Sequence, residues 1–268
     1  MKIKIENINY YLEVCGSGKP LVCLHGFSED QSTWNRLELE GYALYKIDLI
    51  GHGQTDRPRE KSYYELPVLL AHLQHLLARI LPEPYSLLGY SMGGRLALAY
   101  ALTYPEKVAK IILESSSVGI NDPQAKQQRW AKDQTLAEQI LSKGLEWFQS
   151  YWAELPIFAS QKKLPEQVRE EIKQRRLQNS SWALANTLLG SGQGIFPSYA
   201  KQVHSLTLPI LYICGKLDAK YWALGQDLAA QNPRIVLRPV AQAGHNVHLE
   251  QPEVYQKIVQ NFLDSESG

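Results

Sequence analysis

The chain is poor in cysteine and has no long apolar run. Its 268 residues include three cysteines, Cys15, Cys23 and Cys214, and this odd count without a Cys-x-x-Cys pair argues against a disulfide framework and a zinc site. No apolar stretch approaches the roughly 20 residues of a membrane-spanning helix. Residues 1–6 alternate charge with isoleucine, so they lack the apolar core of a signal peptide. We therefore expect a cytoplasmic protein without a membrane span.

An excess of charge of either sign is also missing. The chain has 28 lysines and arginines against 27 aspartates and glutamates, which gives a formal net charge of +1. Nucleic acids and anionic membranes are bound through strong positive fields, so the charge balance gives no reason to expect either partner. Any anion that the protein binds must be recognised by a local group of cations.

Short apolar runs alternate with helical periodicity along most of the chain. Runs typical of strands buried on both faces occur at residues 21–24, 43–47, 86–88, 111–113, 210–213 and 235–237. Helical periodicity occurs at residues 66–80, 96–102 and 252–262. Strict alternation at residues 2–5 and 9–14 suggests an antiparallel pair at a sheet edge. The pattern predicts an α/β fold, with a mostly parallel central sheet and helices on both faces.

The stretch from residue 120 to 201 breaks this alternation. It holds four of the six tryptophans and several helical patterns rich in Gln, Lys and Arg, but no clear strand. We expect residues 120–201 to form a helical cap, inserted into an α/β core made of residues 1–119 and 202–268.

A Gly-x-Ser-x-Gly pentapeptide, Gly89-Tyr90-Ser91-Met92-Gly93, stands between an apolar run and a helix of small residues. In a nucleophile elbow of this type a strand turns sharply into a helix, and the serine oxygen is exposed at the edge of the sheet. The alternative is a glycine-rich turn with an inactive serine. Because serine alone is a poor nucleophile or base, the elbow has chemical meaning only with a histidine and a carboxylate beside it.

Both partners follow later in the chain, each just after a predicted strand. Asp218 comes after the strand that ends near Cys214, and His245 after the strand that ends near Val240. The order Ser, acid, His is that of hydrolases with a nucleophile elbow. Alone, Asp218 could be a helix N-cap and His245 a loop residue, and His248 is a rival base. Together they predict a triad in which Asp218 fixes the tautomer of His245.

The segment His25-Gly26-Phe27 follows another predicted strand and fits an oxyanion-hole turn. We expect the backbone N–H groups of Phe27 and Met92 to bind a developing oxyanion, with His25 bracing the turn. His72 and His75 have helical spacing but no acidic or cysteine ligand nearby. We therefore expect no metal site and no cofactor.

These motifs together resemble the α/β-hydrolase superfamily, as does the loop of residues 48–56. The resemblance implies the α/β-hydrolase fold, whose members include esterases, carbon–carbon hydrolases, dehalogenases and lyases. A narrower similarity, to the 2-succinyl-6-hydroxy-2,4-cyclohexadiene-1-carboxylate synthases of menaquinone biosynthesis, rests on residues 89–95, 155–160, 175–180 and 243–248. It implies a carbon–oxygen lyase that eliminates pyruvate from 2-succinyl-5-enolpyruvyl-6-hydroxy-3-cyclohexene-1-carboxylate, with Ser91 as the proton-abstracting base.

The similarity also implies a small-molecule substrate with three carboxylates, which needs cations. Arginine suits this role because its planar fork binds a carboxylate bidentately and keeps its charge when partly buried. The expected substrate-binding residues are Tyr90, Arg95, Arg129, Trp152 and Arg176. Arg129 could instead lie on a solvated helix face, and of the adjacent Arg175 and Arg176 at most one is expected in the site, with Arg176 favoured.

Two other functions stay open at this point. The same triad could act through an acyl-enzyme in a serine ester hydrolase or a carbon–carbon bond hydrolase. A non-catalytic receptor for a small carboxylate ligand could also keep the fold, although an intact triad argues against this reading.

Overall fold

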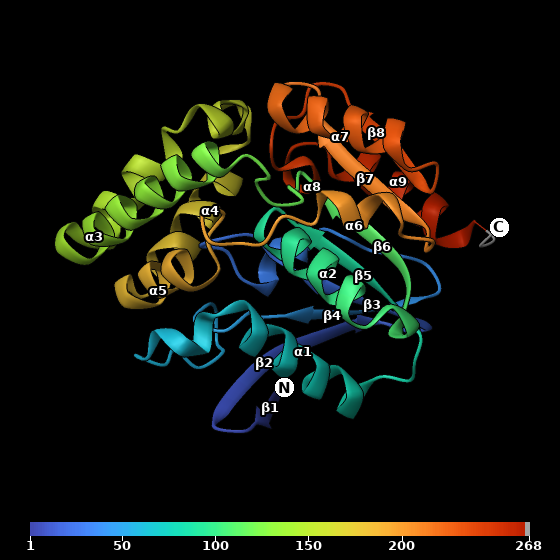
Figure 1. Ribbon diagram of the computed structural model, residues 1–268, viewed down its shortest axis with the longest axis horizontal. Coiled ribbons are helices and arrows are strands. Elements are labelled where there is room, and N and C mark those ends of the chain that lie inside the picture. The colour runs from blue at the N-terminus through green and yellow to red at the C-terminus, as the bar shows by residue number, and fades with distance from the viewer. Residues whose placement is uncertain (266–268) are drawn as a thin grey trace.

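The computed structural model describes residues 1–265 and contains an eight-stranded sheet with the order β1-β2-β4-β3-β5-β6-β7-β8 (Figure 1). The strands are β1 (Lys2–Ile5), β2 (Ile8–Gly16), β3 (Lys19–Leu24), β4 (Tyr42–Ile47), β5 (Tyr85–Tyr90), β6 (Val108–Glu114), β7 (Ile210–Gly215) and β8 (Ile235–Val240). The pairs β1–β2 and β2–β4 are antiparallel, and the other five neighbouring pairs are parallel. The predicted α/β fold with a mostly parallel sheet is therefore confirmed.

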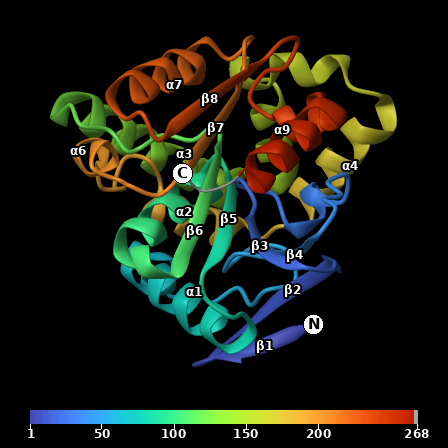
Figure 2. The same ribbon diagram turned by 90° about the vertical axis from the view of Figure 1, so that its right-hand side faces the viewer.

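Helices cover both faces of this sheet, with α1 and α2 on one side and α9 on the other (Figure 2). The flanking helices are α1 (Leu66–Ile80), α2 (Met92–Thr103), α6 (Ala200–His204), α7 (Ala219–Gln231), α8 (Val247–Glu250) and α9 (Pro252–Asp264). Short 3-10 helices are η1 (Gln31–Trp34), η2 (Lys61–Tyr64) and η3 (Pro105–Lys107). Leu66, Leu70, Leu73 and Leu77 recur at helical spacing on α1 and are buried against the sheet.

Between β6 and β7 the chain forms a group of helices that lies together beyond one end of the sheet (Figure 1). These are α3 (Pro123–Ala153), η4 (Pro156–Lys163), α4 (Glu166–Leu177) and α5 (Ser181–Ser191), and residues 115–209, all of them described, include no strand. A small apolar cluster around Ile140, Phe148 and Leu184 joins α3 to α5. α3 is broken at Gly144, whose φ of 79° lies in the region that favours glycine. The exact limits of the cap, residues 120 and 201, stay a prediction.

No helix within residues 1–265 is both long enough and apolar enough to cross a bilayer.

Candidate active site

The elbow at Ser91 has the geometry that its glycines predict. Ser91 lies between β5 and α2 with a φ of 50°, a value that side chains other than glycine rarely adopt. A Cβ atom at Gly93 would collide with the backbone carbonyl of Leu24, and one at Gly89 would collide with Gly93. Only glycine therefore lets β5, β3 and the start of α2 approach so closely, and the turn leaves the Ser91 hydroxyl at the edge of the sheet.

Ser91, His245 and Asp218 come together from three separate loops. The Ser91 Oγ lies 3.1 Å from His245 Nε2, and His245 Nδ1 lies 2.6 Å from Asp218 Oδ2. The carboxylate accepts a hydrogen bond from the Nδ1–H group. It therefore holds His245 in the tautomer whose Nε2 can accept a proton from Ser91. Asp218 Oδ1 also accepts the Tyr221 N–H at 3.3 Å. The N-cap alternative for Asp218 is therefore compatible with the triad.

Two glutamates that the sequence did not single out, the buried Glu114 and the half-buried Glu250, hold the loop of His245. Glu250 accepts the N–H groups of Gly244 and Asn246, at 2.7 and 3.2 Å. Glu114 accepts the His248 N–H at 3.0 Å and contacts the His248 Nδ1 at 2.8 Å. The other ring nitrogen of His248 contacts Thr33 Oγ1. Both nitrogens of His248 thus have partners away from Ser91, which leaves His245 as the histidine beside the serine.

The turn after β3 brings the backbone N–H of Phe27 close to the elbow. His25 Nε2 accepts the Leu49 N–H at 3.0 Å, so its Nδ1 carries the proton and donates to the Gly26 carbonyl at 2.8 Å. Burial lowers the pKa of His25 to about 4, and the ring is therefore neutral near pH 7. Within residues 1–265, the N–H groups of Phe27 and Met92 have no protein acceptor, and both residues line the same cavity as Ser91.

This cavity, the main cavity, has a volume of about 880 Å³ and is lined by Ser91, His245 and side chains from the helices between β6 and β7. All five expected substrate-binding residues, Tyr90, Arg95, Arg129, Trp152 and Arg176, line it. Trp152 stands against the rings of Phe27 and Phe148, with centroids 5.3 Å away in both cases. Burial holds the pKa of Tyr90 well above its usual range, so its hydroxyl stays protonated.

Two of the three arginines are buried without a carboxylate partner. Arg95 makes one long hydrogen bond, 3.4 Å to the Ser191 carbonyl, and burial lowers its pKa to about 10. The buried Arg176 stands 5.3 Å from the centre of the Phe158 ring, and burial also lowers its pKa. Among residues 1–265, no acidic oxygen lies within 4.0 Å of either guanidinium.

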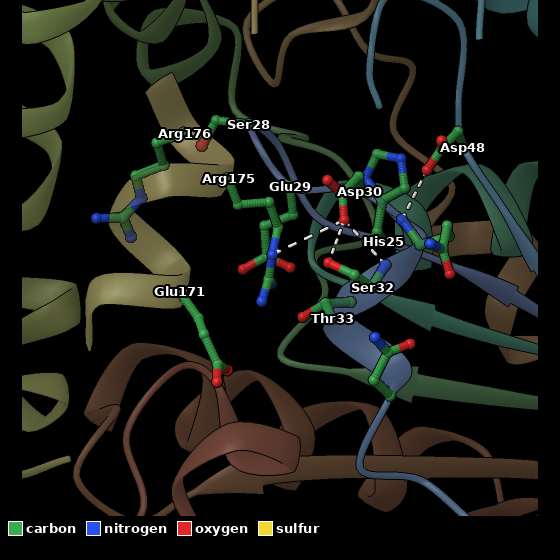
Figure 3. A network of polar contacts seen from close by, with 12 residues as sticks. His25, Ser28, Glu29, Asp30, Ser32, Thr33, Asp48, Glu171, Arg175 and Arg176 are labelled. Carbon is green, nitrogen blue, oxygen red and sulfur yellow. Dashed lines mark hydrogen bonds and ion pairs between the residues drawn. The ribbon is translucent and has the colours of Figure 1, made fainter. Parts of the chain in front are cut away.

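Arg129 and Arg175 are placed differently from these two. Arg129 lines the main cavity and is held by Asp133, 2.7 Å from its Nε, and by Gln193, 2.6 Å from its Nη1. Arg175 does not line that cavity. Its Nε lies 3.8 Å from Asp30 on the core side of α4, whereas Arg176 points away from it (Figure 3). Arg176 is therefore the one of the adjacent pair that lines the same cavity as Ser91.

Further charged residues of the main cavity were missed by sequence reasoning, because each is distant in the chain and carries no motif. They are Glu29, Lys132, Asp133 and Lys220. Glu29 accepts the Asn246 side-chain amide at 3.1 Å. With the three arginines, the lining has five cationic and two acidic side chains, a formal charge of +3. The described residues contain no group of three or more His, Cys, Asp or Glu side chains placed to hold a metal ion.

A Ser–His–Asp relay at the edge of a mostly parallel sheet, beneath inserted helices, defines an enzyme class that uses the α/β-hydrolase fold. The chain belongs to the α/β-hydrolase fold family, whose family model matches residues 19–252.

Within this family, individual relatives are of the enzyme type expected from the sequence. The chain is 39% identical to a putative 2-succinyl-6-hydroxy-2,4-cyclohexadiene-1-carboxylate synthase of Bacillus subtilis (strain 168), over 93% of this chain and 92% of the relative. It is 31% identical to the 2-succinyl-6-hydroxy-2,4-cyclohexadiene-1-carboxylate synthase of Enterobacter sp. (strain 638), over 92% and 94%.

Solved structures agree with this similarity. The structure of MenH from S. aureus superposes with a TM-score of 0.90 at 28% identity, and the match covers 98% of this chain and 100% of that one. A thermophilic esterase from Thermogutta terrifontis superposes with a TM-score of 0.85 at 24% identity, over 98% of each chain. The second match shows the fold alone.

Proposed function

We propose that this protein is a carbon–oxygen lyase of menaquinone biosynthesis. It eliminates pyruvate from 2-succinyl-5-enolpyruvyl-6-hydroxy-3-cyclohexene-1-carboxylate and gives 2-succinyl-6-hydroxy-2,4-cyclohexadiene-1-carboxylate. The observation that carries the proposal is the pair of buried arginines without carboxylate partners, Arg95 and Arg176, which share a cavity with Ser91 and His245. The names of the relatives from Bacillus subtilis and Enterobacter sp. support the same reaction.

Ser91 acts as a base in this reaction. His245 Nε2, 3.1 Å away, takes the Ser91 proton while Asp218 stabilises the imidazolium. The Ser91 alkoxide then removes the proton from the ring carbon that bears the succinyl ketone. The electron pair moves onto the ketone oxygen, where the N–H groups of Phe27 and Met92 stabilise the enolate.

The enolate then collapses and completes the elimination. Its electron pair forms the double bond between ring carbons 2 and 3, the electrons of the existing 3,4 double bond shift to the 4,5 position, and the bond from carbon 5 to the enolpyruvyl oxygen breaks. The departing pyruvate enolate takes a proton from the His245 imidazolium and leaves as pyruvate. Ser91 and His245 return to their starting states, so neither water, a covalent intermediate nor a cofactor is needed.

The arginines bind the carboxylates of the substrate. Hydrogen bonds to charged groups contribute roughly 1.5–3 kcal/mol each, and bidentate pairs more. Arg95 and Arg176 are already largely buried in the folded protein, at 6% and 4% exposed, which lowers the further desolvation of these cations on binding. Tyr90 and Trp152 supply a hydroxyl donor and an aromatic wall for the ring.

The ester or carbon–carbon hydrolase alternative uses the same triad but is not favoured. A generic esterase pocket is mostly apolar, whereas the main cavity has a formal charge of +3. We further propose that residues 120–201 act as the cap and that the enzyme is cytoplasmic, which its three unpaired cysteines support.

The direct test supplies the enolpyruvyl substrate and follows pyruvate with a coupled dehydrogenase, using Ser91→Ala as the control. We expect pyruvate release to depend on Ser91. If the wild type releases pyruvate no faster than buffer, and turns over aryl esters with a burst of one equivalent per enzyme, the protein is a hydrolase and the proposal is wrong.

A further inference from the structure

Asn179 joins the end of α4 to the turn that carries Phe27. Its buried side-chain amide nitrogen lies 2.9 Å from the Ser28 carbonyl, 3.0 Å from the Arg175 carbonyl and 3.2 Å from the Arg176 carbonyl. Figure 3 shows Ser28 and Glu29 beside the end of α4 that bears Arg175 and Arg176. One amide group therefore contacts both the backbone of a cavity arginine and the core loop after β3.

Two peptide groups connect the Ser28 carbonyl to the Phe27 N–H. The Ser28 carbonyl and the Glu29 N–H belong to one planar peptide, and the Glu29 N–H donates to the Gly26 carbonyl at 3.3 Å. The Gly26 carbonyl in turn shares a planar peptide with the Phe27 N–H. The Asn179 amide thus holds the Ser28–Glu29 peptide, and this peptide holds the Gly26–Phe27 peptide, which sets the orientation of the Phe27 N–H. Hydrogen bonds linked in a chain of this kind also polarise one another.

The loop has a physical reason to need this support. Ser28 has a φ of 63°, an uncommon value for a residue other than glycine, and its buried Oγ has no partner among the described residues. Conformations of this kind persist only where the surroundings hold them. His25 fixes the Gly26 carbonyl from the core side, and Asn179 fixes the Ser28 carbonyl from α4.

We propose that Asn179 is a positioning residue that couples Arg176 to the oxyanion donor of Phe27. The inference rests on the proposed function, in which Arg176 binds a substrate carboxylate and the Phe27 N–H meets the enolate oxygen. Asn179 touches neither the substrate nor the reacting atoms. It keeps the end of α4 in a fixed position relative to the oxyanion turn. The same contact therefore positions both Arg176, which binds the substrate carboxylate, and the Phe27 N–H, which donates to the enolate oxygen.

The chain offers variants that separate this link from an ordinary helix-end role. Asn179→Ala removes all three hydrogen bonds. Asn179→Ser keeps a hydroxyl donor beside the end of α4, but its side chain is too short to reach the Ser28 carbonyl. The matched control is Arg36→Ala, because the Arg36–Glu171 pair at 2.8 Å also joins α4 to the core, through side chains that are about one third exposed.

The first measurement is the rate at which a fluorophosphonate modifies Ser91. The phosphoryl oxygen of this reagent occupies the oxyanion hole, and the reagent carries no carboxylate for Arg176. We expect both Asn179 variants to react about 10-fold more slowly than the wild type, a fraction of the roughly 10²–10³-fold loss caused by removing a donor. Arg36→Ala should stay within about twofold of the wild type, since the Arg36 side chain pairs with Glu171 and not with the oxyanion turn.

The second measurement is steady-state pyruvate release, with folding checked by circular dichroism and thermal unfolding. We expect the Asn179 variants to lower kcat more than they raise KM. We also expect Asn179→Ala to cost less in an Arg176→Ala background than alone, since coupled residues are not additive. A folded Asn179→Ser variant with the wild-type phosphonylation rate would overturn the proposal. If the wild type releases no pyruvate but the Asn179 variants are still phosphonylated slowly, the lyase assignment fails while the positioning role stands.

Discussion

Replacing Arg95 with methionine should make the protein more stable and much less active. Arg95 is 6% exposed and has no carboxylate partner, and burial lowers its pKa from 12.5 to about 10. At 1.36 kcal/mol for each pKa unit, the folded state disfavours the charged form by about 3 kcal/mol. Because the pKa is lower in the folded state, the cost is fully present below pH 10, where Arg95 is charged. It is relieved only as the pH rises above 10.

The net gain is smaller than this cost. Arg95→Met also loses the 3.4 Å bond to Ser191 and the contact with the Phe196 ring at 5.3 Å, each worth about 1 kcal/mol or less. Methionine fills a similar volume and leaves no buried charge. We therefore expect the free energy of unfolding to rise by about 1–2 kcal/mol, or the Tm by roughly 2–8 °C.

Catalytic efficiency should move the other way. Loss of a bidentate pair of charge-assisted hydrogen bonds to a substrate carboxylate corresponds to about 3–6 kcal/mol, or a fall in kcat/KM of roughly 10²–10⁴-fold. Urea unfolding and pyruvate release give the two quantities. Arg238→Met, at an exposed position on β8, is the control that removes a positive charge outside the cavity. A variant less stable than the wild type, or one with unchanged kcat/KM, would refute the reasoning.

Three shorter predictions address other parts of the structure. Asp218→Asn should lower kcat by about 10⁴-fold, because an amide favours the wrong tautomer of His245; a loss below 10-fold in the pyruvate assay would exclude this role. Lys110→Met removes the bonds of Nζ to the Phe262, Leu263 and Ser265 carbonyls at the end of α9. It should cost about 1–3 kcal/mol in urea unfolding with unchanged kcat, and equal stability would contradict this. Burial lowers the pKa of His52 to about 3, so its unfolded form takes up a proton below pH 6.5 while the folded form stays neutral. Between pH 7.5 and pH 5 the wild type should therefore lose about 2 kcal/mol of stability relative to His52→Asn, and a pH-independent difference between the two would refute the assignment.

The sequence predicted those parts of the site that depend on neighbours in the chain. The glycines around Ser91 encode a turn that only they permit, and Asp218 and His245 follow strands whose carboxyl ends must meet at one edge of a parallel sheet. The predicted strand runs correspond to β3, β4, β5, β6, β7 and β8 for the same local reason.

Contacts between distant segments could not be predicted in this way. Glu114 and His248 are separated by 134 positions, and Asn179 and Ser28 by 151. Neither pair leaves a periodic or motif signal in the sequence. The break of α3 at Gly144 had a local signal, a glycine inside a helical pattern, but glycine alone does not distinguish a kink from a tolerated helical position.

The nearly neutral composition of the chain did not indicate the positive charge of the main cavity. The chain carries +1 in total and the lining of the main cavity +3, so the remainder carries −2. A substrate with three carboxylates would bring −3 into that cavity. Two buried arginines with no carboxylate within 4.0 Å among the described residues are costly to the folded state until an anion binds. We propose that a carboxylate of the substrate is the missing partner of Arg95, so that relief of this cost on binding contributes to the binding energy.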